Sequence, residues 1–250
     1  QKDYVDAMKR IMKKPFIFFI ITVSLLFIEG CRKDYVVTSE DESSYGWEMF
    51  EQKDYLKSKE WFYNSITTDK KWKDGYNGLG WSYARLLEMD SLDIENIGAI
   101  RTFHRGLTYS YPNNEILYYD NAKGEDYQLR EANVHLEILA GLTFAYQAKG
   151  NNKEAVKFGS ALIDSTLTNP NPPTWHPWAF SHDSTLNWLD LRVTLAASYF
   201  ALAKFDSTHK HLKVVLDSLG SSSKIINDYS TLLGRQKVAE QIDSLQRVLR

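Results

Sequence analysis

Cysteine, proline and surplus charge of either sign are all scarce in this sequence of 250 residues. The single cysteine, Cys31, excludes an internal disulfide and any zinc site built from several thiolates. A formal net charge of -2 gives no concentrated basic surface, so nucleic acid is not an expected partner. The chain is nevertheless 43% hydrophobic and 14% aromatic, which excludes an intrinsically disordered protein and leaves enough apolar side chains for a sizeable core.

An apolar run over residues 16–28 follows Lys13 and Lys14 near the N-terminus. Such a run rises about 20 Å as a helix, which is short of the roughly 30 Å core of a bilayer, so it is typical of a signal peptide rather than a membrane span. We expect residues 1–30 to be a signal peptide. Translation is expected to start at Met12, with the residues before it belonging to an over-extended gene prediction.

The sequence Ile28-Glu29-Gly30-Cys31 places the only cysteine directly after this run. It resembles the start of bacterial lipoproteins, although Glu29 departs from their pattern. The resemblance implies lipid attachment at Cys31, a polar tether over residues 31–43 and, because Arg32 is not aspartate, a place at the outer membrane, on its periplasmic face or at the cell surface. The alternative is an uncleaved anchor or a buried unpaired cysteine.

Internal repetition is the clearest pattern in the rest of the chain. Gly46-Trp47 recurs 34 residues later as Gly80-Trp81. Around the second copy the sequence resembles the tetratricopeptide signature at Tyr76, Leu79, Gly80 and Tyr83. In this register the repeats begin at residues 39, 73, 136 and 189.

The resemblance implies an all-α, tetratricopeptide-type helical-hairpin solenoid of about four repeats plus C-terminal capping helices. The repeat domain is expected over residues 44–222, with insertions at 88–94, 114–135 and 170–188, and the capping helices over residues 223–250.

Several local boundaries follow from turn and cap residues. Gly150 predicts the tight turn inside the third hairpin, and a helix is expected from near Tyr127. Asp183 or Ser184 is expected to cap a helix that begins near Thr185. Two apolar stripes on either side of Gly234 predict two C-terminal helices.

No combination of residues indicates an enzyme, a cofactor or a metal. His209 and His211 are two residues apart on a predicted helix, so they point in different directions and cannot share a metal ion. His182, Asp183 and Ser184 are the residue types of a catalytic triad, but adjacent residues cannot adopt its geometry.

The first helix of each hairpin lines the concave face in tetratricopeptide arrays. The resemblance therefore implies an aromatic series with three polar neighbours as the protein- or peptide-binding residues: Trp47, Asn77, Trp81, Arg85, Phe144 and Gln147. The alternative is that the rings are packing residues between repeats. Because Trp81 takes a place that needs a polar residue, the chaperone-type carboxylate clamp is excluded.

The proline-rich loop offers a second contact through Trp175 and Trp178, or a lid that folds back over the groove. The sequence thus predicts a lipid-anchored envelope scaffold that binds another protein or peptide, and leaves its oligomeric state open. The alternative is a surface lipoprotein that binds a glycan or nutrient through Trp175 and Trp178.

Overall fold

The computed structural model describes residues 36–90, 97–109, 119–120, 125–168 and 178–249. The chain divides into a unit up to Val37 and a body from Thr38 onward, and the body is described here by itself. The predictions at Cys31, at Trp175 and for the signal peptide lie outside the described residues.

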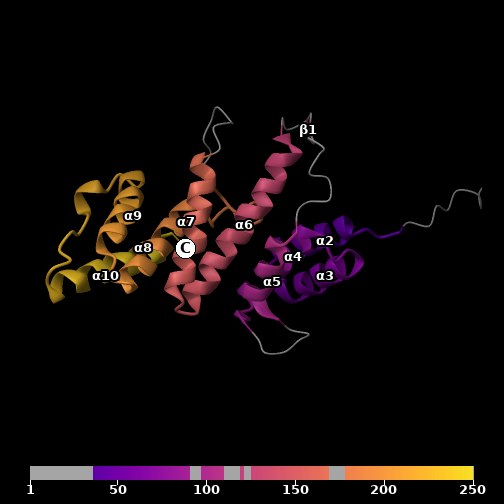
Figure 1. Cartoon of the computed structure of the whole chain (residues 1–250), viewed down its shortest axis with the longest axis horizontal. Helices are drawn as coiled ribbons and strands as arrows, with labels where there is room; N and C mark the ends of the chain where they lie inside the picture. Colours follow the sequence, from indigo (N-terminus) through magenta and orange to yellow (C-terminus); the bar gives the residue numbers. More distant parts are fainter. Residues whose placement is uncertain (1–35, 91–96, 110–118, 121–124, 169–177, 250) are drawn as a thin grey trace, which may run out of the picture. The chain divides into compact units, whose positions relative to one another are not determined.

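Four helical hairpins follow one another along the body (Figure 1). They are α2 (Ser39–Glu51) with α3 (Tyr55–Thr68), α4 (Lys73–Arg85) with α5 (Gly98–Leu107), α6 (Tyr127–Ala148) with α7 (Asn152–Thr168), and α8 (Trp188–Ala201) with α9 (Phe205–Ser218). A short 3-10 turn, η1 (Ser222–Lys224), and a final helix, α10 (Leu232–Val248), complete it, and β1 (Tyr119–Asp120) pairs antiparallel with β2 (Glu125–Asp126) before α6.

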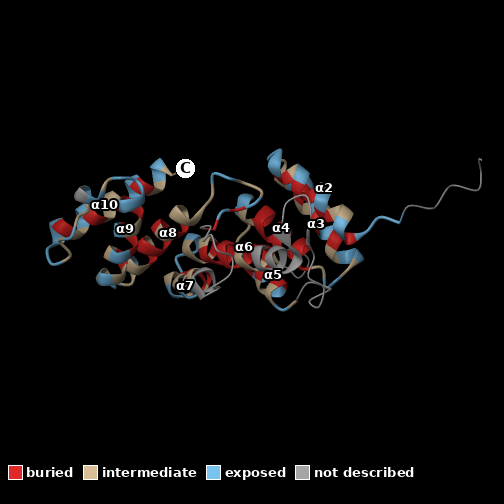
Figure 2. Cartoon of the chain, turned by 90° about the horizontal axis from the view of Figure 1, so that it is seen from above, coloured by how far each residue is buried: buried red, intermediate tan, exposed pale blue. Residues whose placement is uncertain are grey.

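The packing order is that of a solenoid. Within each hairpin the two helices pack together, and the first helix of hairpins two to four also packs against both helices of the hairpin before it. Helix α10 packs on α8 and shares a core with α9. It therefore occupies the position that the first helix of a further hairpin would take. Figure 2 shows buried residues where neighbouring helices meet and exposed ones on the outer surfaces. The prediction of an all-α helical-hairpin solenoid is therefore confirmed.

Phenylalanine rings and glycines explain how closely the helices approach. Phe62 of α3 is fully buried, and a Cβ added to Gly46 of α2 or to Gly78 of α4 would lie 2.8 Å or 2.0 Å from its ring. Phe103 of α5 has the same relation to glycines of α4 and α6. Each ring thus fills the space that two glycines leave open, and this joins one hairpin to the next.

The predicted turn and the predicted start of the third hairpin are confirmed. Gly150 has a φ of +75°, the left-handed conformation in which glycine is favoured, and it ends α6. Helix α6 begins at Tyr127, as expected.

Two predicted helix starts differ from the structure, because capping residues decide them. Residues 39–43, assigned to the tether, form the first part of α2, since Thr38 and Asp41 make a capping box. The helix expected near Thr185 begins only at Trp188, where Asn187 and Asp190 form the capping box. Asp183 instead closes a turn by accepting hydrogen bonds from the backbone N–H and hydroxyl of Thr185.

The prediction of two C-terminal helices was wrong, since the described residues there contain one α-helix. Gly234 lies in the first turn of α10 instead of separating two helices, and its N–H donates to the capping hydroxyl of Thr231. Hydrogen bonds from Thr231 and, secondly, from Ser230 to Asp228 fix the turn before it and lower the pKa of that carboxyl to about 2. Ile225 and Tyr229 pack against the core without being helical.

His211 of α9 is buried against α8, and we expect it to make the stability of this hairpin sensitive to acid. The ring is buried and stacks on Tyr199 at 5.3 Å between centroids, with Arg192 Nη1 3.3 Å from its Nδ1. Burial, and secondly the charge of Arg192, lower the pKa of His211 to about 4. Between that value and the ordinary pKa of about 6.5, His211 is protonated in the unfolded chain but not in the folded chain. The free energy of unfolding therefore falls as the pH falls.

The expected loss through this residue is roughly 2 kcal/mol on going from about pH 7 to about pH 4.5. Urea unfolding at both pH values would measure it. The variant His211→Gln keeps an acceptor for Arg192 but does not titrate, so its loss over the same interval should be smaller by that amount. Equal losses in the two proteins would contradict the assignment.

Candidate functional site

Residues Trp178–Asn187, which we call the strap, lie against the first helices of the first three hairpins. Phe180 enters a socket of aromatic rings, with its centroid 4.4 Å from that of Trp81, 5.8 Å from Phe50 and 6.0 Å from Trp47. Only 1% of Phe180 is exposed. The strap therefore supplies part of the core under the concave side of the first two hairpins.

A buried carboxylate binds the strap next to this ring. Glu137 of α6 accepts hydrogen bonds from the N–H of Ser181 at 3.1 Å and from its hydroxyl at 2.5 Å, both at Oε1. Its Oε2 accepts from Asn77 Nδ2 at 2.6 Å. Burial raises the pKa of Glu137, although the hydrogen bonds from Ser181 oppose this.

The network continues from Asn77 to the first hairpin. Asn77 Nδ2 also lies 3.4 Å from Oδ1 of Asp74, and the other oxygen of Asp74 accepts from the indole N–H of Trp47 at 2.9 Å. Side chains of α2, α4 and α6 are thus joined to the strap through two buried carboxylates.

Two further contacts hold the outer part of the strap. The ring of His182 stacks on Trp47 with 3.6 Å between centroids and an angle of 4°, and its Nδ1 lies 3.2 Å from Glu51 Oε1. Arg85 of α4 forms a salt bridge with Asp183 at 2.5 Å. The strap is therefore bound through an aromatic ring, a backbone N–H, a hydroxyl and a carboxylate.

A cleft of about 500 Å³ opens beside the strap. Its walls come from α4, α6, α8 and α10, with Thr185 and Leu186 of the strap on one side. Trp81 and Phe144 are its aromatic residues, and Gln147 and Gln246 contribute amides from α6 and α10. The first helix of three successive hairpins and the final helix therefore line one continuous surface.

Four of the six predicted binding residues lie around this cleft, namely Trp81, Arg85, Phe144 and Gln147. Arg85 is exposed, while Phe144 and Gln147 are half-buried. Their contact with a partner stays a prediction.

The other two predicted residues lie under the strap. Trp47 is 6% exposed and Asn77 is fully buried, and Trp81 at the edge of the cleft is only 3% exposed. These tryptophans act as packing residues in this structure, which is the alternative that the sequence left open. Trp178 is also buried, so it presents no open ring to a glycan.

Sequence reasoning did not find the residues that hold the strap. Phe180 lies in the insertion at 170–188, whereas Glu137 lies in the third repeat. No periodicity of the sequence relates the two residues. One signal was present, because Glu137 interrupts the apolar stretch from Leu136 to Ala140, where a carboxylate needs a partner.

The acidic residues and histidines of the described part of the chain form no group that could hold a metal ion. None of the helices described has the length and apolar composition needed to cross a membrane.

The packing order defines the body as an all-α solenoid of helical hairpins, in which each hairpin contacts its neighbours along the chain. No protein-family model and no curated protein matches the chain. Among solved structures it is similar to a chain of the APC/C hetero-tetramer Cut9–Hcn1, with 13% identity and a TM-score of 0.36. The match covers 85% of this chain and 38% of that chain.

Proposed function

We propose that this chain is a scaffold of the bacterial cell envelope that binds another protein or peptide in the cleft beside the strap, without chemistry of its own. The cleft carries the proposal, because the first helices of three hairpins and α10 converge on it. Its size lies in the range of ligand sites, and its aromatic floor with amides around it suits a peptide.

We also propose that Cys31 carries a lipid that anchors the protein to the outer membrane. The support is the signal-like run that ends at this cysteine. Thr38, which caps the first helix, is seven residues further on, so a link of at most about 25 Å would join the lipid to the scaffold. The scaffold would then act at the membrane surface.

The cleft is tested with Phe144→Ala and Gln147→Ala in the full chain, because these half-buried residues can be truncated with less damage than buried Trp81. Recovery of a specific protein from solubilised envelopes should fall roughly tenfold for the double variant, since aromatic anchors carry much of the energy of an interface. Tyr63→Ala is the matched control, because Tyr63 is an exposed aromatic on α3 and does not line the cleft. Undiminished recovery by the double variant, or no specific protein with the unchanged chain, would count against the cleft.

The anchor is tested with Cys31→Ser. Cells that express the unchanged chain should incorporate labelled palmitate into it and retain it with membranes, whereas the variant should lose the label and be released in soluble form. A single thiol provides the only site of this acylation in the sequence, so label that persists in the variant would exclude the anchor.

A further inference from the structure

We propose that the strap fills a second recognition site, on the concave side of the first two hairpins, as a built-in competitor. A partner would take this site with a segment that repeats the pattern of Phe180-Ser181-His182-Asp183: an aromatic residue, then a hydroxyl residue, then a carboxylate two positions later. This site shares Trp81 and Arg85 with the cleft, but the proposal does not depend on a partner binding in the cleft.

The contacts of the strap are those of a bound peptide. Phe180 occupies the socket of Trp47, Phe50 and Trp81, and Asp183 pairs with Arg85. All four of these partners belong to α2 and α4, the first helices of their hairpins. They line the surface that faces a ligand in a solenoid.

Glu137 gives the site its selectivity. A core that only needed filling would be as stable or more stable with an apolar residue there, because a buried carboxylate carries a desolvation cost. Glu137 instead accepts from both the N–H and the hydroxyl of Ser181. A segment without a hydroxyl residue at this position would leave the buried Glu137 carboxylate without that hydrogen bond. Such a segment should therefore bind more weakly.

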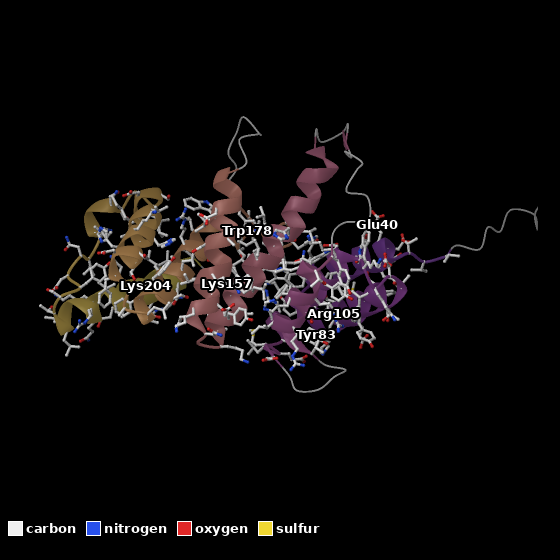
Figure 3. All side chains as sticks on the ribbon, in the orientation of Figure 1. Glu40, Tyr83, Arg105, Lys157, Trp178 and Lys204 are labelled. Carbon is white, nitrogen blue, oxygen red and sulfur yellow. The ribbon has the colours of Figure 1, made fainter. Side chains whose placement is uncertain are left out.

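The strap is also built as a unit that can lift without unwinding a helix. Its own hydrogen bonds close it, from Phe180 N to Leu186 O at 2.9 Å and from Leu186 N to Asp183 O at 3.0 Å. At the base of the strap, Asn187 and Asp190 cap α8, and the N–H of Trp188 donates to the carbonyl of Trp178 at 2.8 Å (Figure 3 labels Trp178). Lifting only the turn from Phe180 to Asp183 leaves these bonds in place and breaks the docking contacts.

Burial of Phe180 and Trp178 keeps the lifted form in the minority. The apparent affinity of a competing segment is reduced by the fraction of open molecules. An unchanged chain should consequently bind such a segment weakly, and a chain with a weakened strap should bind it well.

The test uses a labelled, capped peptide with the sequence of residues 178–187 and the full chain carrying Phe180→Gly, Ser181→Gly and Asp183→Ser together. The peptide should bind this variant at least roughly tenfold more tightly than it binds the unchanged chain. A control peptide with Phe180→Ala and Ser181→Ala should bind the variant at least roughly tenfold more weakly than the parent peptide. A helical, cooperatively melting variant that does not bind the parent peptide, or that binds both peptides alike, overturns the proposal.

Hydrogen exchange on the unchanged chain keeps the proposal testable if the triple variant does not fold. The amide of Ser181, which donates to Glu137, should exchange through a local opening, at least roughly tenfold faster than the buried amides of α6. If this amide exchanges only with global unfolding, the strap does not lift and the site does not exist. Neither result would change the outcome of the recovery experiment with Phe144→Ala and Gln147→Ala, which tests the cleft. The two proposals can therefore fail independently.

Discussion

Replacing Glu137 by alanine should lower the free energy of unfolding by about 4 kcal/mol. The change removes the acceptor for the amide of Asn77, which is fully buried, and for the N–H and hydroxyl of Ser181 on the strap. Each buried donor left without a partner costs about 1–3 kcal/mol, and the vacated volume adds to this. Urea unfolding followed by circular dichroism would measure the loss.

The matched control is Glu137→Gln, which keeps the shape and should cost about 1 kcal/mol or less. Its carbonyl can accept from Ser181. If the Asn77 side-chain amide turns over, the glutamine NH2 can donate to Asn77 Oδ1, a buried oxygen without a partner among the described residues. A loss for glutamine as large as that for alanine would mean that the negative charge, not the hydrogen bonds, holds the network. A loss below about 1 kcal/mol for alanine would show that the network contributes little.

The same pair of proteins reveals the titration of Glu137. Burial raises the pKa of this carboxyl, so the folded chain binds its proton more tightly than the unfolded chain does. The resulting stabilisation is complete below the ordinary carboxyl pKa and is lost as the pH rises through the raised value. Hydrogen bonds from Ser181 and Asn77 and the charge of His182 oppose this effect on the pKa, whereas the charge of Asp74 adds to it. Relative to Glu137→Gln, the unchanged chain should therefore lose stability from acid to neutral pH.

Local sequence determined the hairpins well, because their packing depends on residues close together in the chain. Gly46 and Gly80 recur at the spacing of one repeat, and the rings of Phe62 and Phe103 lie against them. Small residues opposite rings at these positions favour one packing arrangement of the neighbouring helices. The order of the elements could be derived for this reason.

Docking of the strap could not be derived in the same way. Phe180 meets Trp81 across 99 residues of chain, and no local pattern encodes such a contact. The start of α8 was misplaced because two sets of cap residues compete there, and Asn187 with Asp190 forms the complete capping box. The sequence predicts a helix break at Gly234, but the cap at Thr231 allows a glycine in the first turn.

Replacing Phe62 by alanine should lower the free energy of unfolding by about 4 kcal/mol, because the ring is fully buried between two hairpins. Gly78→Ala should cost roughly 2 kcal/mol. Its new Cβ would lie 2.0 Å from the ring of Phe62, and overpacking outweighs the gain of about 1 kcal/mol in helix propensity.

The double variant is the decisive measurement. Once Phe62→Ala has removed the ring, the methyl group of Gly78→Ala enters vacated space, so both changes together should cost less than their sum by about 1–3 kcal/mol. Gly106→Ala serves as the control, because its nearest neighbours are 3.0 Å away and belong to flexible Ile138 and to Tyr76. Additive losses for Phe62 and Gly78 would mean that the two hairpins can shift apart without cost. The joint between hairpins would then not depend on this ring, and the rigid concave surface that both binding proposals need would lose its physical basis.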